Sequence, residues 1–130
     1  MTLIENQLTT LIGNTDIDSD HQTFINILNQ LALTNNAEFP ALFQQLYIHT
    51  EQHFYREKQL MQQTAFPSES EHSGEHQRVL AEFKQFKTRI DKGLIGFGRA
   101  FVTERLPQWF QLHVSTMDNA LVAHLNIKEA

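Results

Sequence analysis

The amino-acid sequence predicts an all-α protein built as an up-down-up-down four-helix bundle. Apolar residues recur at spacings of three and four in four separate segments, which is the period of an amphipathic helix. The connections between these segments are short, and no stretch shows the alternating pattern of a strand. The chain has 130 residues, enough for one domain with its own hydrophobic core. We therefore expect a single domain over residues 1–130, with an N-terminal arm at 1–16 and a bundle at about 17–127.

The first helix is expected to follow a turn at Gly13-Asn14, with Asp16 or Asp18 as its N-cap. Its apolar stripe consists of Ile17, His21, Phe24, Ile25, Leu28, Leu31 and Ala32. The first helix is expected to end at Asn35-Asn36.

The second helix is predicted to begin at Phe39-Pro40, because proline is favoured in a first turn. Its inner stripe consists of Leu42, Phe43, Leu46, Thr50, His53, Phe54, Glu57, Leu60 and Met61. A glutamate within an apolar face is costly to bury unless it is paired or bound to a metal. The stretch 64–70, which contains Pro67, is predicted to be a loop.

The third helix is expected to start near Ser68 or Ser70 and to end at Gly93, a good C-cap residue. Its inner face carries His72, His76, Val79, Leu80, Phe83, Phe86 and Ile90. Gly74 lies between the two histidines and costs the helix roughly 1 kcal/mol relative to alanine. We interpret it as a point of close approach by a neighbour.

Residues 93–102 contain three glycines and form a connection whose structure the sequence leaves open. The fourth helix is clear from about Leu106, with Pro107 either in its first turn or at a kink. The period is followed by Leu106, Trp109, Phe110, His113, Val114, Met117, Leu121, Val122 and Leu125. Asp118 falls among these apolar residues, five positions after His113.

Every predicted helix carries a candidate metal ligand on its apolar stripe. The seven candidates are His21, His53, Glu57, His72, His76, His113 and Asp118. Residues four apart lie on one helix face, so two pairs, His53 with Glu57 and His72 with His76, each present two donors together. A lone histidine on such a face is usually a hydrogen-bonded core residue, but seven converging polar groups would be a costly core without a metal.

The donor types narrow the choice of metal. Imidazole with carboxylate suits iron, zinc or manganese. Seven ligands exceed the four of one zinc ion, and they suit two ions bridged by carboxylates. His49 and His124 belong to no pair and are interpreted as surface or supporting residues.

Composition excludes several classes of protein. The chain has no cysteine, which removes disulfides, iron–sulfur clusters and thiolate zinc sites. Its net charge of −5 argues against a nucleic-acid partner. No apolar run approaches a membrane span, and no secretion signal is recognisable, so we expect a cytoplasmic protein. The ten phenylalanines fit either a dry aromatic cavity beside the imidazoles or simply a phenylalanine-rich core.

Four motifs together resemble the hemerythrin family, specifically the small single-domain bacteriohemerythrins. They are I-D-S-D-H at 17–21, H-F-Y-R-E at 53–57, H-S-G-E-H at 72–76 and W-F-Q-L-H-V-S-T-M-D at 109–118. The resemblance implies a non-haem di-iron centre that binds O2 reversibly. It places His72, His76 and His113 on one iron. It places His21 and His53 on the other, which keeps an open position for O2, and bridges the two irons by Glu57, Asp118 and an oxo or hydroxo group.

The resemblance also implies an apolar O2 pocket that excludes water. Its lining here is expected from Phe24, Phe54, Trp109, Phe110, Val114 and Met117. The chain departs from the family in lacking an early tryptophan, in having Lys58 after the bridging glutamate, and in having Phe24 where an aliphatic residue is common. Phe24 is expected to narrow the pocket.

The function implied by the resemblance is to carry, store or deliver O2, without enzymatic activity. Two alternatives remain. One is a module that senses O2, NO or redox state through a separate protein partner. The other is a di-iron protein that handles peroxide or iron.

Overall fold

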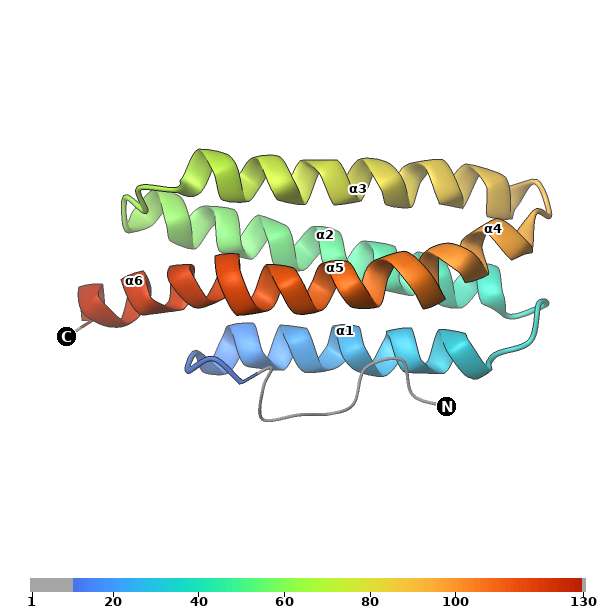
Figure 1. Ribbon diagram of the computed structural model, residues 1–130, viewed down its shortest axis with the longest axis horizontal. Coiled ribbons are helices and arrows are strands. Elements are labelled where there is room, and N and C mark those ends of the chain that lie inside the picture. Colours follow the sequence, from blue (N-terminus) through green and yellow to red (C-terminus); the bar gives the residue numbers. More distant parts are fainter. Residues whose placement is uncertain (1–10, 130) are drawn as a thin grey trace.

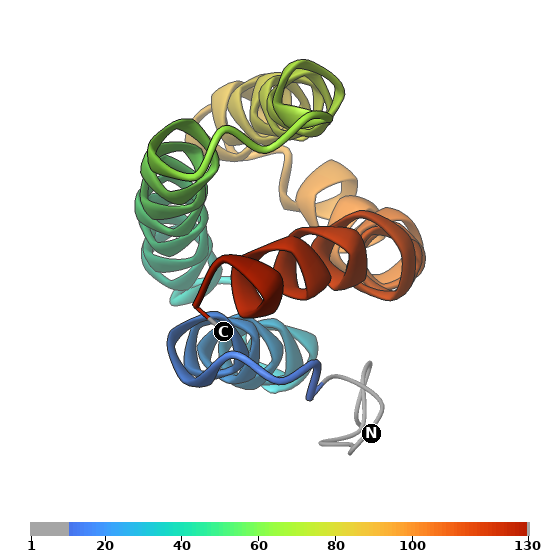
Figure 2. The same cartoon turned by 90° about the vertical axis from the view of Figure 1, so that its left-hand side faces the viewer.

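Four antiparallel helical rods make up the chain in this computed structural model, which describes residues 11–129 (Figure 1). The first three rods are single helices: α1 (Thr15–Leu33), α2 (Phe39–Gln63) and α3 (Glu69–Asp91). The connections lie at alternating ends of the rods, and the end view shows the four rods surrounding one interior (Figure 2). The predicted all-α, up-down-up-down bundle is confirmed.

The fourth rod is one continuous but irregular helix. Its segments in order are α4 (Ile95–Ala100), η2 (Phe101–Arg105), α5 (Leu106–His113), η3 (Val114–Asp118) and α6 (Asn119–Glu129). The segments η2 and η3 are π-helical turns, in which backbone hydrogen bonds span five residues instead of four. Residues 95–105, which the sequence left without a defined form, are therefore helical.

Pro107 lies in the first turn of α5, directly after the π-helical turn η2. Proline has no N–H for the helix ladder and its ring collides with a preceding carbonyl, so it disturbs a regular α-helix. The wider turn before it, in which the N–H of Leu106 donates to the carbonyl of Phe101, lets the rod continue through the proline.

Local sequence signals mark several helix ends, with two corrections. The expected capping of α3 by a serine side chain was wrong, because Ser68 precedes the helix without a side-chain hydrogen bond to it and Ser70 lies inside it. Asn14 is the N-cap of α1, because its side chain accepts the N–H of Ile17. The expected cap by Asp16 or Asp18 was wrong. Asp18 instead accepts the N–H of Ile12, so it holds the preceding turn onto the helix. Residues 1–10 of the expected N-terminal arm lie outside the described residues, and α1 already begins at Thr15.

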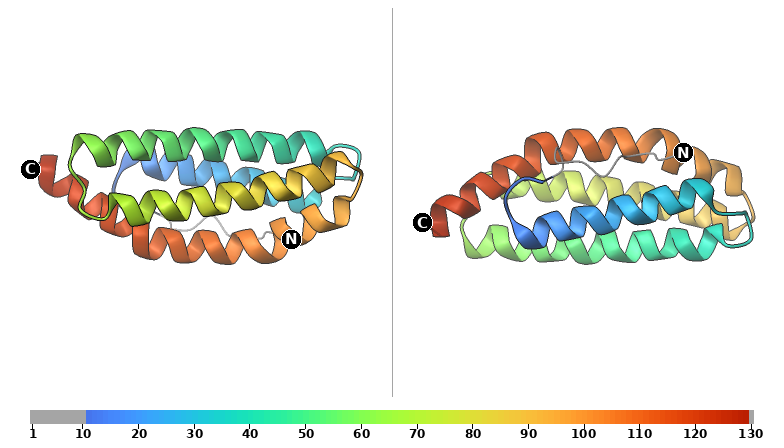
Figure 3. Two further views of the ribbon diagram at one scale, coloured as in Figure 1. Left: turned by 90° about the horizontal axis from the view of Figure 1, so that it is seen from above. Right: turned by 90° about the horizontal axis from the view of Figure 1, so that it is seen from below.

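Two hydrophobic clusters fill the interior. The larger draws on all four rods, with Phe39, Phe43, Phe83 and Phe101 among its most deeply buried members. The smaller closes one end of the bundle and contains Ile17, Met61, Phe66, Leu121, Val122 and Leu125. Beyond η3, α6 bends across this end towards α1 and α2 (Figures 2 and 3). Among residues 11–129, no helix combines the length and apolar character needed to cross a membrane.

Candidate metal centre

Seven polar side chains come together inside the bundle, and they are the seven that the sequence singled out. They are His21 from α1, His53 and Glu57 from α2, His72 and His76 from α3, His113 from α5 and Asp118 from η3. All seven are buried, with exposed fractions between 1% and 7%. Uncompensated burial of so many polar groups would strongly destabilise a fold, so the arrangement points to a bound cation.

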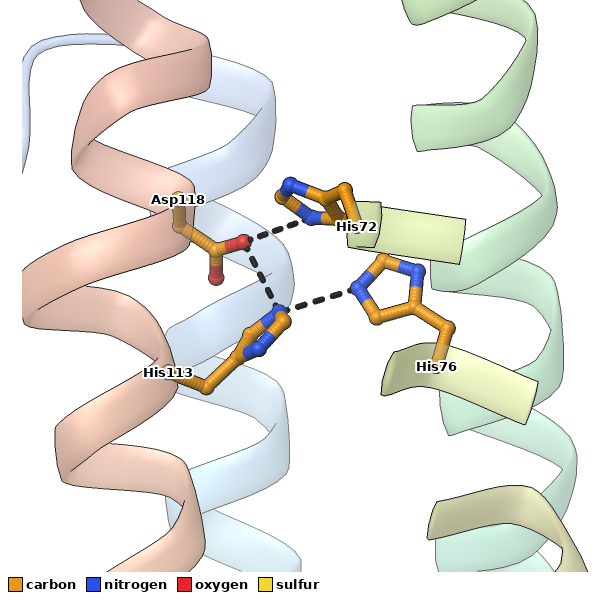
Figure 4. Close-up of side chains that lie close together, drawn as sticks. All are labelled: His72, His76, His113 and Asp118. Carbon is orange, nitrogen blue, oxygen red and sulfur yellow. Dashed lines mark hydrogen bonds and ion pairs between the residues drawn. The ribbon is translucent and has the colours of Figure 1, made fainter. Parts of the chain in front are cut away.

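Three imidazoles and one carboxylate form the first group (Figure 4). The Nε2 atoms of His76 and His113 lie 2.9 Å apart. Oδ1 of Asp118 lies 3.1 Å from Nε2 of His72 and 3.1 Å from Nε2 of His113. The potential ligand atoms of this group all lie within 4.8 Å of one another, so one ion can contact them all with small adjustments.

The second group shares Asp118 with the first and adds His21, His53 and Glu57. Nε2 of His21 lies 2.9 Å from Oδ2 of Asp118, and Nε2 of His53 lies 2.6 Å from Oε2 of Glu57. The other oxygen of Glu57 lies 3.0 Å from Nε2 of His72, in the first group. Both carboxylates therefore face both groups, which is the arrangement that two neighbouring ions with bridging carboxylates require.

A π-helical turn brings Asp118 to the same face as His113. In a regular α-helix, residues five apart point about 140° away from each other. In η3 the N–H of Asn119 donates to the carbonyl of Val114, five residues earlier, so each turn holds more residues. The side chains of His113 and Asp118 consequently meet, although their spacing in the sequence does not match an α-helical face.

The donor atoms fit a pair of cations. All five imidazoles direct Nε2 inwards, as the contacts above show. Oε2 of Glu57 and Oδ1 of Asp118 are buried and face imidazole nitrogens, but neither oxygen makes a well-aligned hydrogen bond to them. Two imidazole nitrogens that face each other, as in His76 and His113, can share only one proton, whereas a cation between them satisfies both lone pairs.

The buried carboxylates shift the pKa values of the imidazoles that lie next to them. Burial works against charge on His53, but the negative charge of Glu57 and a hydrogen bond to Asp20 raise its pKa to about 10. Burial has the same effect on His72, and hydrogen bonds to Asp118 and Glu57 raise its pKa to about 9. Without a metal, protons thus stand in for the cations between imidazole and carboxylate.

Asp20 supports the centre from outside and was not identified in the sequence. Nδ1 of His53 donates to its Oδ2 at 2.8 Å, and Arg56 binds the same carboxylate through Nη2 at 2.7 Å. Burial acts against its charge, but the hydrogen bonds from His53 and Arg56 hold the pKa of Asp20 well below its usual range. Such a partner fixes the orientation of a ligand imidazole and its tautomer. Its position immediately before His21 was the available signal.

A small apolar cavity lies against the second group. The volume open to the centre of a water-sized sphere is about 10 Å³, which is room for about one molecule of the size of water. Its lining includes the ligand candidates His21, His53, His113 and Asp118. The remaining wall consists of Phe24, His49, Thr50, Phe54, Trp109 and Phe110.

Four of the six residues that the sequence assigned to a pocket therefore line this cavity: Phe24, Phe54, Trp109 and Phe110. Val114 is buried in the larger hydrophobic cluster, and Met117 is partly exposed; neither lines the cavity. His49 and Thr50 line it and were not predicted to do so. Both lie one helical turn or less before His53, and Thr50 also belongs to the predicted inner stripe of the second helix.

Aromatic rings of the cavity wall also pack on the candidate ligands. The indole of Trp109 stacks on His113 with ring centroids 4.7 Å apart, and Phe54 stacks on His76 at 3.6 Å. Nε1 of Trp109 donates to Glu75 at 3.0 Å, which holds the indole in place. Phe24 and Phe110 stack on each other at 4.5 Å. The wall and the metal-binding side chains thus form one packed unit.

Comparison with known proteins agrees with this site. Residues 13–125 match the family model described as hemerythrin HHE cation binding domain. The chain is 35% identical over 114 residues to a bacteriohemerythrin of Ralstonia nicotianae, covering 88% of this chain and 82% of that protein. It is 28% identical to a bacteriohemerythrin of Aquifex aeolicus over 120 residues, covering 88% and 91%.

A solved structure has the same fold. The crystal structure of a leucine-to-phenylalanine mutant superimposes with a TM-score of 0.81 at 21% identity, covering 92% of this chain and 94% of the other. The region matched by the family model, residues 13–125, contains all seven converging side chains. Together with this metal-binding arrangement, the family match over most of the chain shows that the protein belongs to the hemerythrin family and is similar to bacteriohemerythrins.

Proposed function

We propose that this chain binds O2 reversibly at a centre of two iron ions and acts as a carrier, store or delivery protein for O2, not as an enzyme. Its relatives' names and the five-imidazole, two-carboxylate donor set support iron as the metal. We expect the protein to be cytoplasmic and O2 to be its small-molecule partner.

In this proposal His72, His76 and His113 hold one iron and His21 and His53 hold the other. Glu57 and Asp118 bridge them, since each carboxylate contacts both groups. The first iron then has three imidazoles and the second only two. An ion held by the second group would therefore have more room for an external ligand.

One observation carries the proposal: the apolar cavity touches the side of the site that has only two imidazoles. Both of its imidazoles, His21 and His53, line the cavity, whereas only His113 of the other three does. A small apolar molecule such as O2 fits a space of about 10 Å³ with this lining better than a polar substrate does.

When bound, reduced iron supplies the electrons and the coordination that let a protein hold O2. The chain's own residues do the rest. The rings of Phe24, Phe54, Trp109 and Phe110 exclude water from the cavity, which protects the site from side reactions such as proton leakage and loss of the electrons. The hydroxyl of Thr50 donates its proton to the carbonyl of Leu46 at 2.7 Å, so it has no proton left to donate to a water in the cavity.

The test begins with metal analysis of protein produced with added iron, for which we expect close to two irons per chain. The iron protein is then reduced without air and exposed to O2 in a spectrometer. A visible absorption band should appear, disappear under vacuum and return with air over several cycles. One zinc per chain would contradict the two-iron centre. Immediate irreversible oxidation in air would contradict the carrier role and favour redox sensing or peroxide handling.

A further inference from the structure

One residue of the cavity wall is much more exposed to solvent than the others. Ten residues line the cavity, and nine of them are buried; His49 alone is half-buried. Its side chain is therefore the most exposed part of the wall, since none of the other nine residues is more than 7% exposed. A molecule that reaches the cavity by another direct route has to displace a side chain that is almost fully buried.

His49 is held in place by one hydrogen bond between two helices. Its Nε2 lies 2.9 Å from the backbone carbonyl of Asp20 in α1. A carbonyl can only accept, so Nε2 carries the proton and the ring donates. Burial lowers the pKa of His49, which keeps the ring neutral. The ring lies parallel to His53, with the centroids 6.4 Å apart, and it belongs to neither group of candidate ligands.

The other side chains that line the cavity are held by more contacts than His49. Phe24 and Phe110 are stacked on each other and almost fully buried, and Trp109 is stacked on His113 and bonded to Glu75. Moving any of these rings exposes apolar surface or disturbs a candidate ligand. Rotation of His49 breaks a single hydrogen bond and brings a polar ring into water, where it can be solvated.

We propose that His49 is the gate of the cavity, through which O2 enters and leaves. The hydrogen bond to Asp20 keeps the gate closed, and rotation of the imidazole towards solvent opens it. This inference rests on the proposed function for the identity of the ligand, but the gate itself is a property of the protein wall. The gate controls the rates of binding and release but not the binding equilibrium. The reason is that the gate is closed both in the free protein and in the complex, so it stabilises both states equally.

The first experiment measures access without using iron. Trp109 is the only tryptophan of the chain and lines the cavity. Zinc-loaded protein is suitable because Zn²⁺ has no redox chemistry. Dissolved O2 is the probe, and the quenching rate constant of the Trp109 fluorescence lifetime is the readout. His49→Ala should raise this constant about 3- to 10-fold, the factor expected for loss of one net hydrogen bond that closes the gate.

Two further variants sharpen the test. His49→Gln keeps a side-chain N–H that can reach the Asp20 carbonyl, so it should stay near the wild-type value. His124→Ala is the matched control, because His124 is also half-buried and its Nε2 lies 2.8 Å from the backbone carbonyl of Thr64, away from the cavity. It should leave the quenching constant unchanged. Equal quenching in His49→Ala and His124→Ala would overturn the gate.

The second experiment uses the iron-loaded protein. In His49→Ala, the association and dissociation rates of O2 should rise by the same factor, with the dissociation constant within about twofold of wild type. A change confined to the dissociation rate would overturn the gate and show that His49 stabilises the bound state. If iron-loaded wild type does not bind O2 reversibly, the proposed function fails, while the zinc experiment still decides whether His49 controls access.

Discussion

Nε2 of His113 lies 3.1 Å from Oδ1 of Asp118, although five positions separate the two residues. The contact exists because the backbone between them forms a π-helical turn. The other oxygen of Asp118 lies 2.9 Å from His21 in α1. One carboxylate on the irregular fourth rod therefore touches both groups of candidate ligands.

Asp118→Ala should abolish the binding of both irons. It removes the carboxylate shared by the two groups and leaves five buried imidazoles with only Glu57 to neutralise them. Iron content should fall from about two per chain to near zero, and the increase in unfolding temperature that metal produces should vanish. Asp91→Ala, which removes an exposed carboxylate paired with Lys87, serves as the control. Two irons retained in Asp118→Ala would refute the bridging role.

Asp20→Ala should weaken the metal site without emptying it. The substitution removes the acceptor of His53 Nδ1–H, and loss of such a supporting partner typically lowers metal affinity about 10- to 100-fold. Competition with a chelator of known affinity measures the change. Asp16→Ala is the control, because Asp16 is exposed on the same helix. Equal chelator resistance in Asp20→Ala and wild type would mean that the hydrogen bond to His53 is dispensable.

Trp109→Ala should speed oxidation of the oxygenated protein about 10-fold or more by letting water into the cavity. Iron content should change little, since the indole supplies no ligand atom. Truncation of a buried tryptophan typically costs about 3–5 kcal/mol of stability, so the variant is compared at a temperature well below its unfolding transition. Trp109→Phe keeps most of the ring and should oxidise at an intermediate rate. Oxidation no faster than wild type would show that the wall assignment is wrong.

Metal loading should release about two protons per chain at pH 7. Without metal, the raised pKa values of His53 and His72, about 10 and about 9, keep both imidazoles protonated at that pH. A metal needs their lone pairs, so it displaces the protons, and affinity increases as the pH rises. Titration of Fe²⁺ without air into weakly buffered protein measures the release. Loading at pH 7 with no proton release would contradict the charge state inferred for the cluster.

The same shifts set the pH range in which the metal-free fold is most stable. The pKa values of His53 and His72 are raised by folding, so their contribution is fully present below about pH 6.5 and lost as the pH rises through 9 and 10. The pKa of Asp118 is held far below its usual value, so its contribution is present above about pH 4 and lost in stronger acid. Chemical unfolding of metal-free protein should therefore show lower stability at pH 10 than at pH 6.

Gly74→Ala should stabilise the protein by about 0.5–1 kcal/mol. The expected close approach at this glycine was wrong, because a Cβ placed there meets no atom within 4 Å. The substitution therefore gains helix propensity between His72 and His76 without a clash. Chemical unfolding measures the change, and Gly98→Ala is the opposite control, since its Cβ would lie 2.5 Å from Ile90. A destabilised Gly74→Ala would indicate a contact that the structure does not contain.

The sequence by itself determined the fold class, several helix ends and the identity of the seven converging side chains. Helical periodicity fixes which face of its own helix a residue occupies, and it marked the five histidines and Glu57. Asp118 was marked instead as a carboxylate among apolar residues. His53 with Glu57, and His72 with His76, lie four apart, and both pairs point into the interior where that spacing predicted. The proline at position 40 and the glycine at position 93 marked helix ends through their own backbone preferences.

Only the tertiary structure decided how the pieces meet. The spacing of five between His113 and Asp118 does not belong to any α-helical face, and packing of α6 over the end of the bundle accompanies the π-helical turn that aligns them. The contact of Asp20 with His53 and the place of His49 in the cavity wall depend on how α1 and α2 are set against each other. Periodicity describes one helix at a time, whereas a distance between two helices is fixed by the side chains that fill the space between them.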